Sequence, residues 1–119
     1  EVPLYYYASD GVVFPYTSFY TGGSGPLMKG ACTYGRPVIA SDVSELGHLV
    51  HESHLGLLCK PDDPESLAAC IRDFLGMPED RKLRMAERAL ALGRANSWDA
   101  MAGRFSQLFR ALTTSQRLR

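Results

Sequence analysis

The chain has no excess of charge of either sign, because its 13 Lys and Arg residues balance its 13 Asp and Glu residues. No overall field therefore draws it to nucleic acid or to an anionic lipid surface. No apolar run reaches the roughly 20 residues that a membrane-spanning helix needs, and no signal-peptide layout opens the chain. These absences predict a cytoplasmic protein without a nucleic-acid partner and without an integral membrane span.

Cysteine is scarce, and its spacing does not suggest a disulfide or metal framework. Cys32, Cys59 and Cys70 form no CxxC or CxxH pattern, and each lies in an apolar setting. An odd number of widely spaced cysteines is typical of reduced, buried thiols in an intracellular protein. We therefore expect free cysteines.

Histidine is also rare, but the three histidines are regularly spaced. His48, His51 and His54 are three residues apart, which would place them along one side of a helix. No acidic or cysteine ligand has a matching spacing. We therefore interpret them as solvated surface residues and expect no metal site.

What is present is a core-forming composition in 119 residues, 45% of them hydrophobic, which is one domain's worth. Short apolar runs predict buried strands at residues 12–14, 38–40 and 55–59. Helical periodicity and capping residues predict helices near 2–9, 26–34, 44–51, 64–75, 78–90 and 98–112. Alternating strands and helices predict an α/β fold, a three-stranded parallel sheet with helices on both faces.

A doubly wound domain usually has five or six strands, so residues 1–119 are predicted to be the second half of one, with the N-terminal portion missing. The chain also begins with Glu inside a predicted helix, which suggests a piece of a longer protein. Without the other half, the strand at 12–14 would be an apolar sheet edge. We expect association through this edge, as a homodimer or with the missing part.

Aromatic residues gather in two predicted helices. The last helix has a regular apolar stripe that includes Trp98, Phe105 and Leu112, which predicts core packing; residues 113–119 are expected to fray. Tyr5 to Tyr7, in the first helix, could form a base-stacking platform, although core and interface packing is the commoner use of such side chains.

The most informative stretch is a glycine-rich loop between the first strand and the next helix. Gly22, Gly23 and Gly25 would let backbone amides approach an anion, and Ser24 would add a hydroxyl. A helix that begins near Pro26 would contribute its unsatisfied amides and the positive end of its dipole. A phosphate or diphosphate is the natural ligand of such a loop, although neither GxxxxGK[ST] nor GxGxxG is present, and glycines serving only turn geometry are the alternative.

The order of landmarks along the chain resembles the C-terminal donor-binding domain of the retaining GT-B glycosyltransferases of family 4, group 1. The strand opening at Ala8-Ser9-Asp10, the loop Gly22 to Gly25 and the segment GRPVIASD at 35–42 follow the family's order. The helix start DPESLA at 63–68 and the pair Ser97-Trp98 continue it. The resemblance therefore covers almost the whole chain.

The resemblance implies a partial Rossmann-like, GT-B C-terminal domain that binds a nucleotide diphospho-sugar. Its donor site would comprise residues of the glycine loop and of the helix that follows: Thr21, Gly22, Gly23, Ser24, Gly25, Leu27 and Lys29. The implied reaction is transfer of the sugar, with retention, to an acceptor that the sequence does not identify. No cofactor or metal is implied beyond the donor substrate.

One departure concerns the glutamate pair of the family, separated by seven residues, which we align with Thr21 and Lys29. Neither residue is acidic, and charged Lys29 cannot accept a hydrogen bond from a ribose. It could pair with a phosphate or point to solvent, while Ser24-Gly25-Pro26-Leu27 looks like a variant loop. The ribose-binding role is therefore not carried over, and no catalytic residue is named.

Three functional hypotheses follow. The first is a fragment of a glycosyltransferase, inactive alone because its basic pair and acceptor side lie in the missing part, which could also attach the protein to a membrane. The second is a non-catalytic glycosyltransferase-like domain for binding or assembly. The third is a signalling receiver, which lacks support because Asp10 precedes its strand and no acidic cluster follows it.

Overall fold

The computed structural model describes residues 1–23 and 25–117 and has the predicted α/β architecture. Three parallel strands, β1 (Val12–Phe14), β2 (Val38–Ser41) and β3 (Gly56–Cys59), form one sheet in the order β1-β2-β3. Val13 pairs with Ile39, and Ile39 pairs with Leu57. Each strand coincides with a predicted apolar run, so the strand positions are confirmed. The predicted burial holds throughout β2, but in β1 only Phe14 and in β3 only Cys59 is buried.

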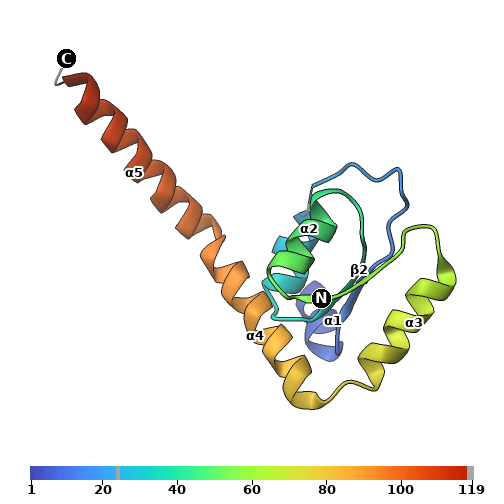
Figure 1. Ribbon diagram of the computed structural model, residues 1–119. Coiled ribbons are helices and arrows are strands. Elements are labelled where there is room, and N and C mark those ends of the chain that lie inside the picture. The colour runs from blue at the N-terminus through green and yellow to red at the C-terminus, as the bar shows by residue number, and fades with distance from the viewer. Residues whose placement is uncertain (24, 118–119) are drawn as a thin grey trace.

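Helices cover both faces of this sheet, as predicted (Figure 1). The π-helix η1 (Leu27–Cys32) and α2 (Ser44–Glu52) lie on one face, and α3 (Pro64–Leu75) lies on the other. The helix α4 (Glu79–Ala95) packs against η1 from outside. The first helix is α1 (Val2–Ala8), and the last is α5 (Trp98–Arg117).

The main core lies between the sheet and the face covered by η1 and α2. Alternate residues of β1 and β2 point into it, among them Phe14, Val38 and Ala40. Leu27 of η1 and Leu46 of α2 fill it from the other side, each with 1% of its surface exposed. This packing fixes the helix that follows the glycine loop against the strands that precede and follow it.

Local signals explain where the elements begin and end. The Asp63 carboxylate accepts a hydrogen bond from the Ser66 amide at 2.9 Å, and the Ser97 hydroxyl accepts one from the Ala100 amide at 3.1 Å. Both side chains therefore cap the helices that follow them. Gly35 has φ of 60° just after η1, a left-handed conformation that glycine takes without a Cβ clash.

The first helix, α1, is attached through aromatic and basic side chains. Tyr6 stacks on Tyr34 with ring centroids 4.8 Å apart, and Tyr7 meets Tyr34 edge-on at 5.2 Å. The Arg36 guanidinium donates to the Ser9 carbonyl oxygen at 3.1 Å. Tyr5 is 75% exposed, so this helix lies on the surface and holds no core residue.

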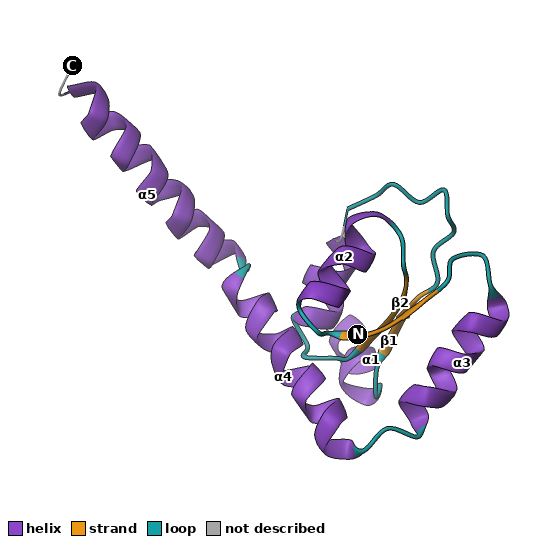
Figure 2. Cartoon of the chain, viewed as in Figure 1, coloured by secondary structure: helices purple, strands orange, loops and turns teal. Residues whose placement is uncertain are grey.

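The last helix departs from prediction. Figure 2 shows α5 projecting away from the sheet, and no residue of it is buried. Trp98, Phe105 and Leu112 are 73%, 53% and 54% exposed, so the expected core packing of this stripe is wrong. The expected fraying is also wrong for residues 113–117, which remain helical. Residues 118 and 119 lie outside the described residues.

Other departures are smaller. Leu75 and Leu83, in the helices predicted near 64–75 and 78–90, are 67% and 59% exposed. All three cysteines are free, as predicted, but only Cys32 and Cys59 are buried. In the part of the chain that the structure describes, no helix is both long and apolar enough to cross a membrane.

Candidate functional site

The carboxyl ends of the three strands lie at one edge of the sheet, where ligands bind in open parallel sheets. A hollow of about 280 Å³ opens there. It is lined by residues that follow each strand: Pro15, Tyr16 and Thr17 after β1, Ser41 at the end of β2, and Cys59, Lys60, Asp62, Asp63, Pro64 and Leu67 after β3. The sheet therefore gathers polar groups from segments far apart in the sequence.

The loop after β1 is held in place by aromatic stacking and by two hydrogen bonds. Tyr16 stacks on Tyr20 with ring centroids 4.0 Å apart, and the Tyr20 hydroxyl donates to the Gly23 carbonyl oxygen at 2.9 Å. The Ser18 amide donates to the Asp62 carboxylate at 3.0 Å. The glycine loop is thus attached to the turn after β3.

The pKa values of two side chains at this edge are shifted. Hydrogen bonds from Ser18 lower the pKa of Asp62 and so favour its carboxylate form. Burial, followed by the neighbouring Tyr20, raises the pKa of Tyr16, which stays a neutral phenol. Carboxylate and phenol groups suit the hydroxyls of a sugar or ribose better than a free phosphate, which the carboxylate would repel.

An anion is better accommodated at the start of η1. Among the described residues, no side chain accepts a hydrogen bond from the backbone amides at the start of this helix, and helix-start amides have no partner within the helix. Gly25 is exposed, and a Cβ added at Gly23 or Gly25 would meet nothing within 4 Å. The backbone at this point is therefore open to a ligand, as amide donors for a phosphate must be.

The sequence predicts an ordinary helix from 26 to 34, but the structure has a π-helix at Leu27–Cys32. The helix ends in a Schellman motif at Gly35, where the Arg36 amide donates to the Ala31 carbonyl oxygen at 2.8 Å and the Gly35 amide donates to the Cys32 carbonyl oxygen at 3.2 Å. The apolar pattern cannot distinguish the two helix types, because both bury the same residues. π-Helices are rare in proteins, but a large share of those that occur lie at functional sites.

The predicted site residues are distributed over several surroundings. Thr21 and Gly23 are exposed in the loop, whereas Gly22 lies against the Tyr20 ring. Leu27 is in the core, so only its backbone can face a ligand. Ser24 lies outside the described residues.

Gly25 and Lys29 come together in a second hollow of about 430 Å³, with Glu45 from the first turn of α2 among its other lining residues. This hollow lies on the helix side of the sheet, between η1, α2 and the start of α5. Of the predicted donor-site residues that the structure describes, none lines the hollow of about 280 Å³.

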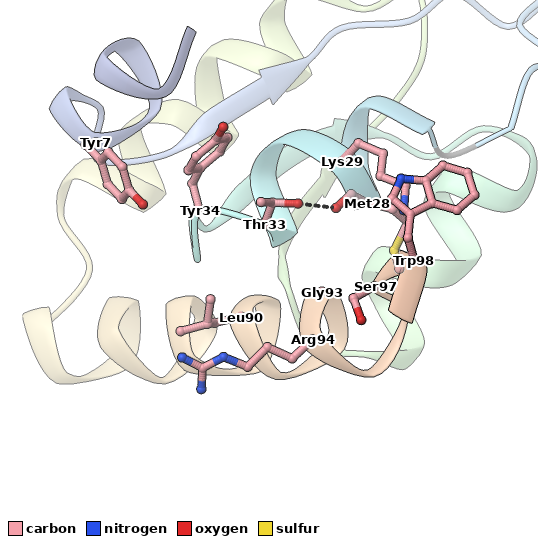
Figure 3. A pocket seen from close by; sticks show the side chains of 10 residues that line it. All are labelled: Tyr7, Met28, Lys29, Thr33, Tyr34, Leu90, Gly93, Arg94, Ser97 and Trp98. Atoms are coloured by element: carbon pink, nitrogen blue, oxygen red, sulfur yellow. Dashed lines mark hydrogen bonds between the residues drawn. The ribbon is translucent and has the colours of Figure 1, made fainter. Parts of the chain in front are cut away.

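Lys29 has a defined partner that the sequence does not reveal. Its ammonium lies 4.1 Å from the centroid of the Trp98 ring, an attraction between a cation and an aromatic face. Figure 3 shows this pair at one end of a larger hollow of about 580 Å³, with Tyr7 and Tyr34 at the other end and Arg94 along α4. Lys29 therefore faces the junction of α4 and α5.

Sequence reasoning missed Tyr16, Tyr20, Lys60 and Asp62 at the carboxyl edge. Lys60 and Asp62 could have been predicted at this edge, because they follow the predicted strand at 55–59. Tyr16 and Tyr20 could not, because their stacking depends on how the loop folds back. Among the described residues, no three His, Cys, Asp or Glu side chains are grouped to hold a metal ion.

Comparison with known proteins identifies the family. The family model described as glycosyl transferases group 1 matches residues 1–77. The chain belongs to the group 1 glycosyltransferases. It is 32% identical over 116 residues to a D-inositol 3-phosphate glycosyltransferase of Corynebacterium efficiens, and 30% identical over 114 residues to the protein of that name from Corynebacterium urealyticum. These alignments cover 98% and 96% of this chain but 26% of each relative.

A solved structure supports the glycosyltransferase fold. Sucrose-phosphate synthase from Thermosynechococcus elongatus superimposes with a TM-score of 0.75 at 31% identity, covering 94% of this chain and 27% of that one. The predicted GT-B, Rossmann-like fold is therefore confirmed. The chain spans about a quarter of the length of the relatives it matches.

Proposed function

We propose that this chain is the second half of the donor-binding domain of a retaining glycosyltransferase. It would help to hold a nucleotide diphospho-sugar whose sugar is transferred to an acceptor not yet identified. The observation that carries this proposal is the position of the glycine loop, which follows β1 at the carboxyl edge and leads directly into the helix that contains η1. The family of the chain supports it.

In this proposal the diphosphate lies over residues 21–25 and the first turn of η1. Amides and the positive end of the helix stabilise the departing diphosphate. Glu45, in the hollow of about 430 Å³, and Tyr16, in the hollow of about 280 Å³, would form hydrogen bonds with hydroxyl groups of the donor. No metal and no covalent protein intermediate is required of these residues.

The rest of such an enzyme would supply the acceptor side, further phosphate-binding basic groups and any attachment to a membrane. The relatives are about four times as long as the matched segment, which leaves room for these parts. We expect the 119-residue chain alone to bind the donor weakly and to transfer no sugar. Sugar transfer by this chain alone would contradict the assignment as half of a site.

The test is a titration of the chain with UDP-glucose, GDP-mannose and ADP-glucose in turn. Binding is measured from the changes in the NMR chemical shifts of backbone amides. Gly25→Val places a side chain in the open space at the start of η1, and Gly103→Val makes the same change on α5, where a Cβ also meets nothing within 4 Å. We expect Gly25→Val to weaken binding by at least tenfold and Gly103→Val to leave it unchanged. Equal binding by both variants would remove the loop from the site.

A second candidate is a non-catalytic domain that keeps the fold for binding or assembly. The observation that favours this candidate is that no Asp or Glu occurs from Gly11 to Ser41. The glutamate pair of the family, which we align with Thr21 and Lys29, therefore has no acidic counterpart in this stretch. Donor turnover by the whole protein separates the two candidates. Donor binding without turnover would favour the non-catalytic domain.

A further inference from the structure

A basic hollow lies between α2 and α4, at the end of the sheet opposite the glycine loop. It measures about 160 Å³ and borders Gly56, the first residue of β3. Val50 and Met85, which are 0% and 6% exposed, line it as well. Its other lining residues are all basic or can become so: His51, His54, Arg81 and Arg88.

Among the residues that the structure describes, no carboxylate lines this hollow, although acidic residues are close in sequence. Glu79 and Asp80 precede Arg81, but the Glu79 carboxylate is 3.2 Å from the Lys82 ammonium and the Asp80 carboxylate is 3.1 Å from the Arg84 guanidinium. Within residues 1–23 and 25–117, the Arg81 side chain forms no ion pair or hydrogen bond, and neither does that of Arg88. Both guanidinium groups are therefore available to a ligand.

The basic side chains are carried by well-defined backbone. Arg81 and Arg88 are seven residues apart on α4, which places them on the same side of the helix two turns apart. On α2, the end of the helix is fixed by the bonds from the His54 amide to the His51 carbonyl oxygen and from the Leu55 amide to the Val50 carbonyl oxygen, at 3.2 and 3.1 Å. The carbonyl groups that accept these bonds are thereby satisfied.

Like charges gathered without a counter-charge repel one another, and an anion between them removes this cost. Guanidinium groups bind phosphate oxygens in pairs of parallel hydrogen bonds, and imidazole N–H groups add single donors. The hollow is smaller than the roughly 300–1,000 Å³ of a site for a whole small molecule. A single tetrahedral oxyanion is the ligand that matches both its size and its charge.

We propose that the hollow between α2 and α4 binds a phosphate group, either inorganic phosphate or the phosphate of a monoester. It is separate from the donor loop, because it lies at the amino end of β3 and the loop follows the carboxyl end of β1. Arg81 and Arg88 supply the charge, and His51 and His54 supply further N–H donors. The site does not depend on the proposed sugar transfer.

The test is an NMR titration of the 119-residue chain with inorganic phosphate and, separately, with glycerol 3-phosphate, at constant ionic strength made up with sodium chloride. We expect saturable amide shifts at His51, His54 and around Arg88. Arg81→Ala and Arg88→Ala should each weaken binding by about tenfold, as expected for loss of a charge-assisted bond. Arg84→Ala, on the same helix but paired with Asp80, is the matched control and should bind as the unmodified chain does.

Saturable binding of both ligands supports the proposal, and a tighter complex with glycerol 3-phosphate would identify the monoester as the source of the phosphate. The proposal is overturned if neither ligand gives saturable shifts, or if Arg81→Ala and Arg88→Ala bind as tightly as Arg84→Ala. Unchanged amide shifts of the β2 residues serve as the check that each variant is folded. If an alanine variant fails that check, Arg81→Gln and Arg88→Gln, which keep the side-chain length, replace it.

Discussion

Two helix-interior glycines, Gly93 of α4 and Gly103 of α5, differ in what surrounds them. A Cβ at Gly93 would lie 2.7 Å from the Cys32 carbonyl oxygen, whereas one at Gly103 would meet nothing within 4 Å. Gly93→Ala should therefore lower the free energy of unfolding by about 1–3 kcal/mol through overpacking against η1. Gly103→Ala should raise it by about 0.5–1 kcal/mol, provided α5 unfolds with the domain.

Urea denaturation of both variants and the unmodified chain measures these changes. The two substitutions are chemically identical and both lie in helices, so propensity alone predicts stabilisation by each. Stabilisation by Gly93→Ala would contradict the close contact between α4 and η1.

The buried thiol of Cys32 links stability to pH. Burial raises the pKa of this thiol from 9.0 to about 11, so the folded state disfavours the thiolate. The contribution of Cys32 to the free energy of unfolding is therefore fully present below pH 9. It is lost as the pH rises toward 11, because the thiol ionises at a lower pH in the unfolded chain than in the folded one. A shift of this size corresponds to a loss of about 2–3 kcal/mol.

Denaturation between pH 7 and 11 should therefore show a steeper fall for the unmodified chain than for Cys32→Ala. The variant lacks the titrating group but keeps every tyrosine and lysine, so the difference between the two profiles isolates Cys32. Parallel profiles would show that Cys32 makes no such contribution.

At the scale of elements, the stripe of α5 illustrates what periodicity leaves open. A regular apolar stripe predicts that one face of a helix is apolar, but not which partner covers it. Phe105 and Phe109 contact each other with centroids 6.2 Å apart, and both remain exposed. The strands at 12–14, 38–40 and 55–59 could be predicted because a short apolar run between helical patterns is a local signal in the sequence.

For the candidate site, the position of the glycine loop could be predicted from the sequence, but the contacts around it could not. The position of the glycine loop follows from the order of strand, loop and helix, and the structure places it at the carboxyl edge as expected. The contact between Lys29 and Trp98 joins residues 69 positions apart in the sequence, and the bond between Ser18 and Asp62 joins residues 44 apart. Such contacts depend on tertiary packing that local patterns do not contain.

The exposure of α5 leads to a prediction about its phenylalanines. Phe105→Ala and Phe109→Ala should each change the free energy of unfolding by less than about 1.5 kcal/mol, the upper range for an aromatic pair. Phe74→Ala, the same change at a residue 5% exposed on α3, should cost about 3–5 kcal/mol. Urea denaturation compares the three variants. A cost near that of Phe74→Ala at either α5 position would mean that the stripe is packed after all.

At the scale of the whole molecule, β1 is an edge strand of the sheet. The Val12 amide donates to the Pro37 carbonyl oxygen at 2.9 Å, so the alternation along a strand turns the polar backbone groups of Val13 toward the open edge. Val13 is 41% exposed. An exposed apolar edge of this kind recruits another strand.

We therefore expect the chain to associate through β1, with a second copy when no other partner is present. The Val13→Lys variant should shift the chain toward monomer, because lysine on an edge strand opposes pairing. Phe19→Lys makes a similar change in a loop residue that is 89% exposed and should leave the association unchanged. Light scattering over a range of concentrations measures the mass. A monomeric unmodified chain would contradict the prediction, as would association that survives Val13→Lys but is lost in Phe105→Ala, because the interface would then lie on α5.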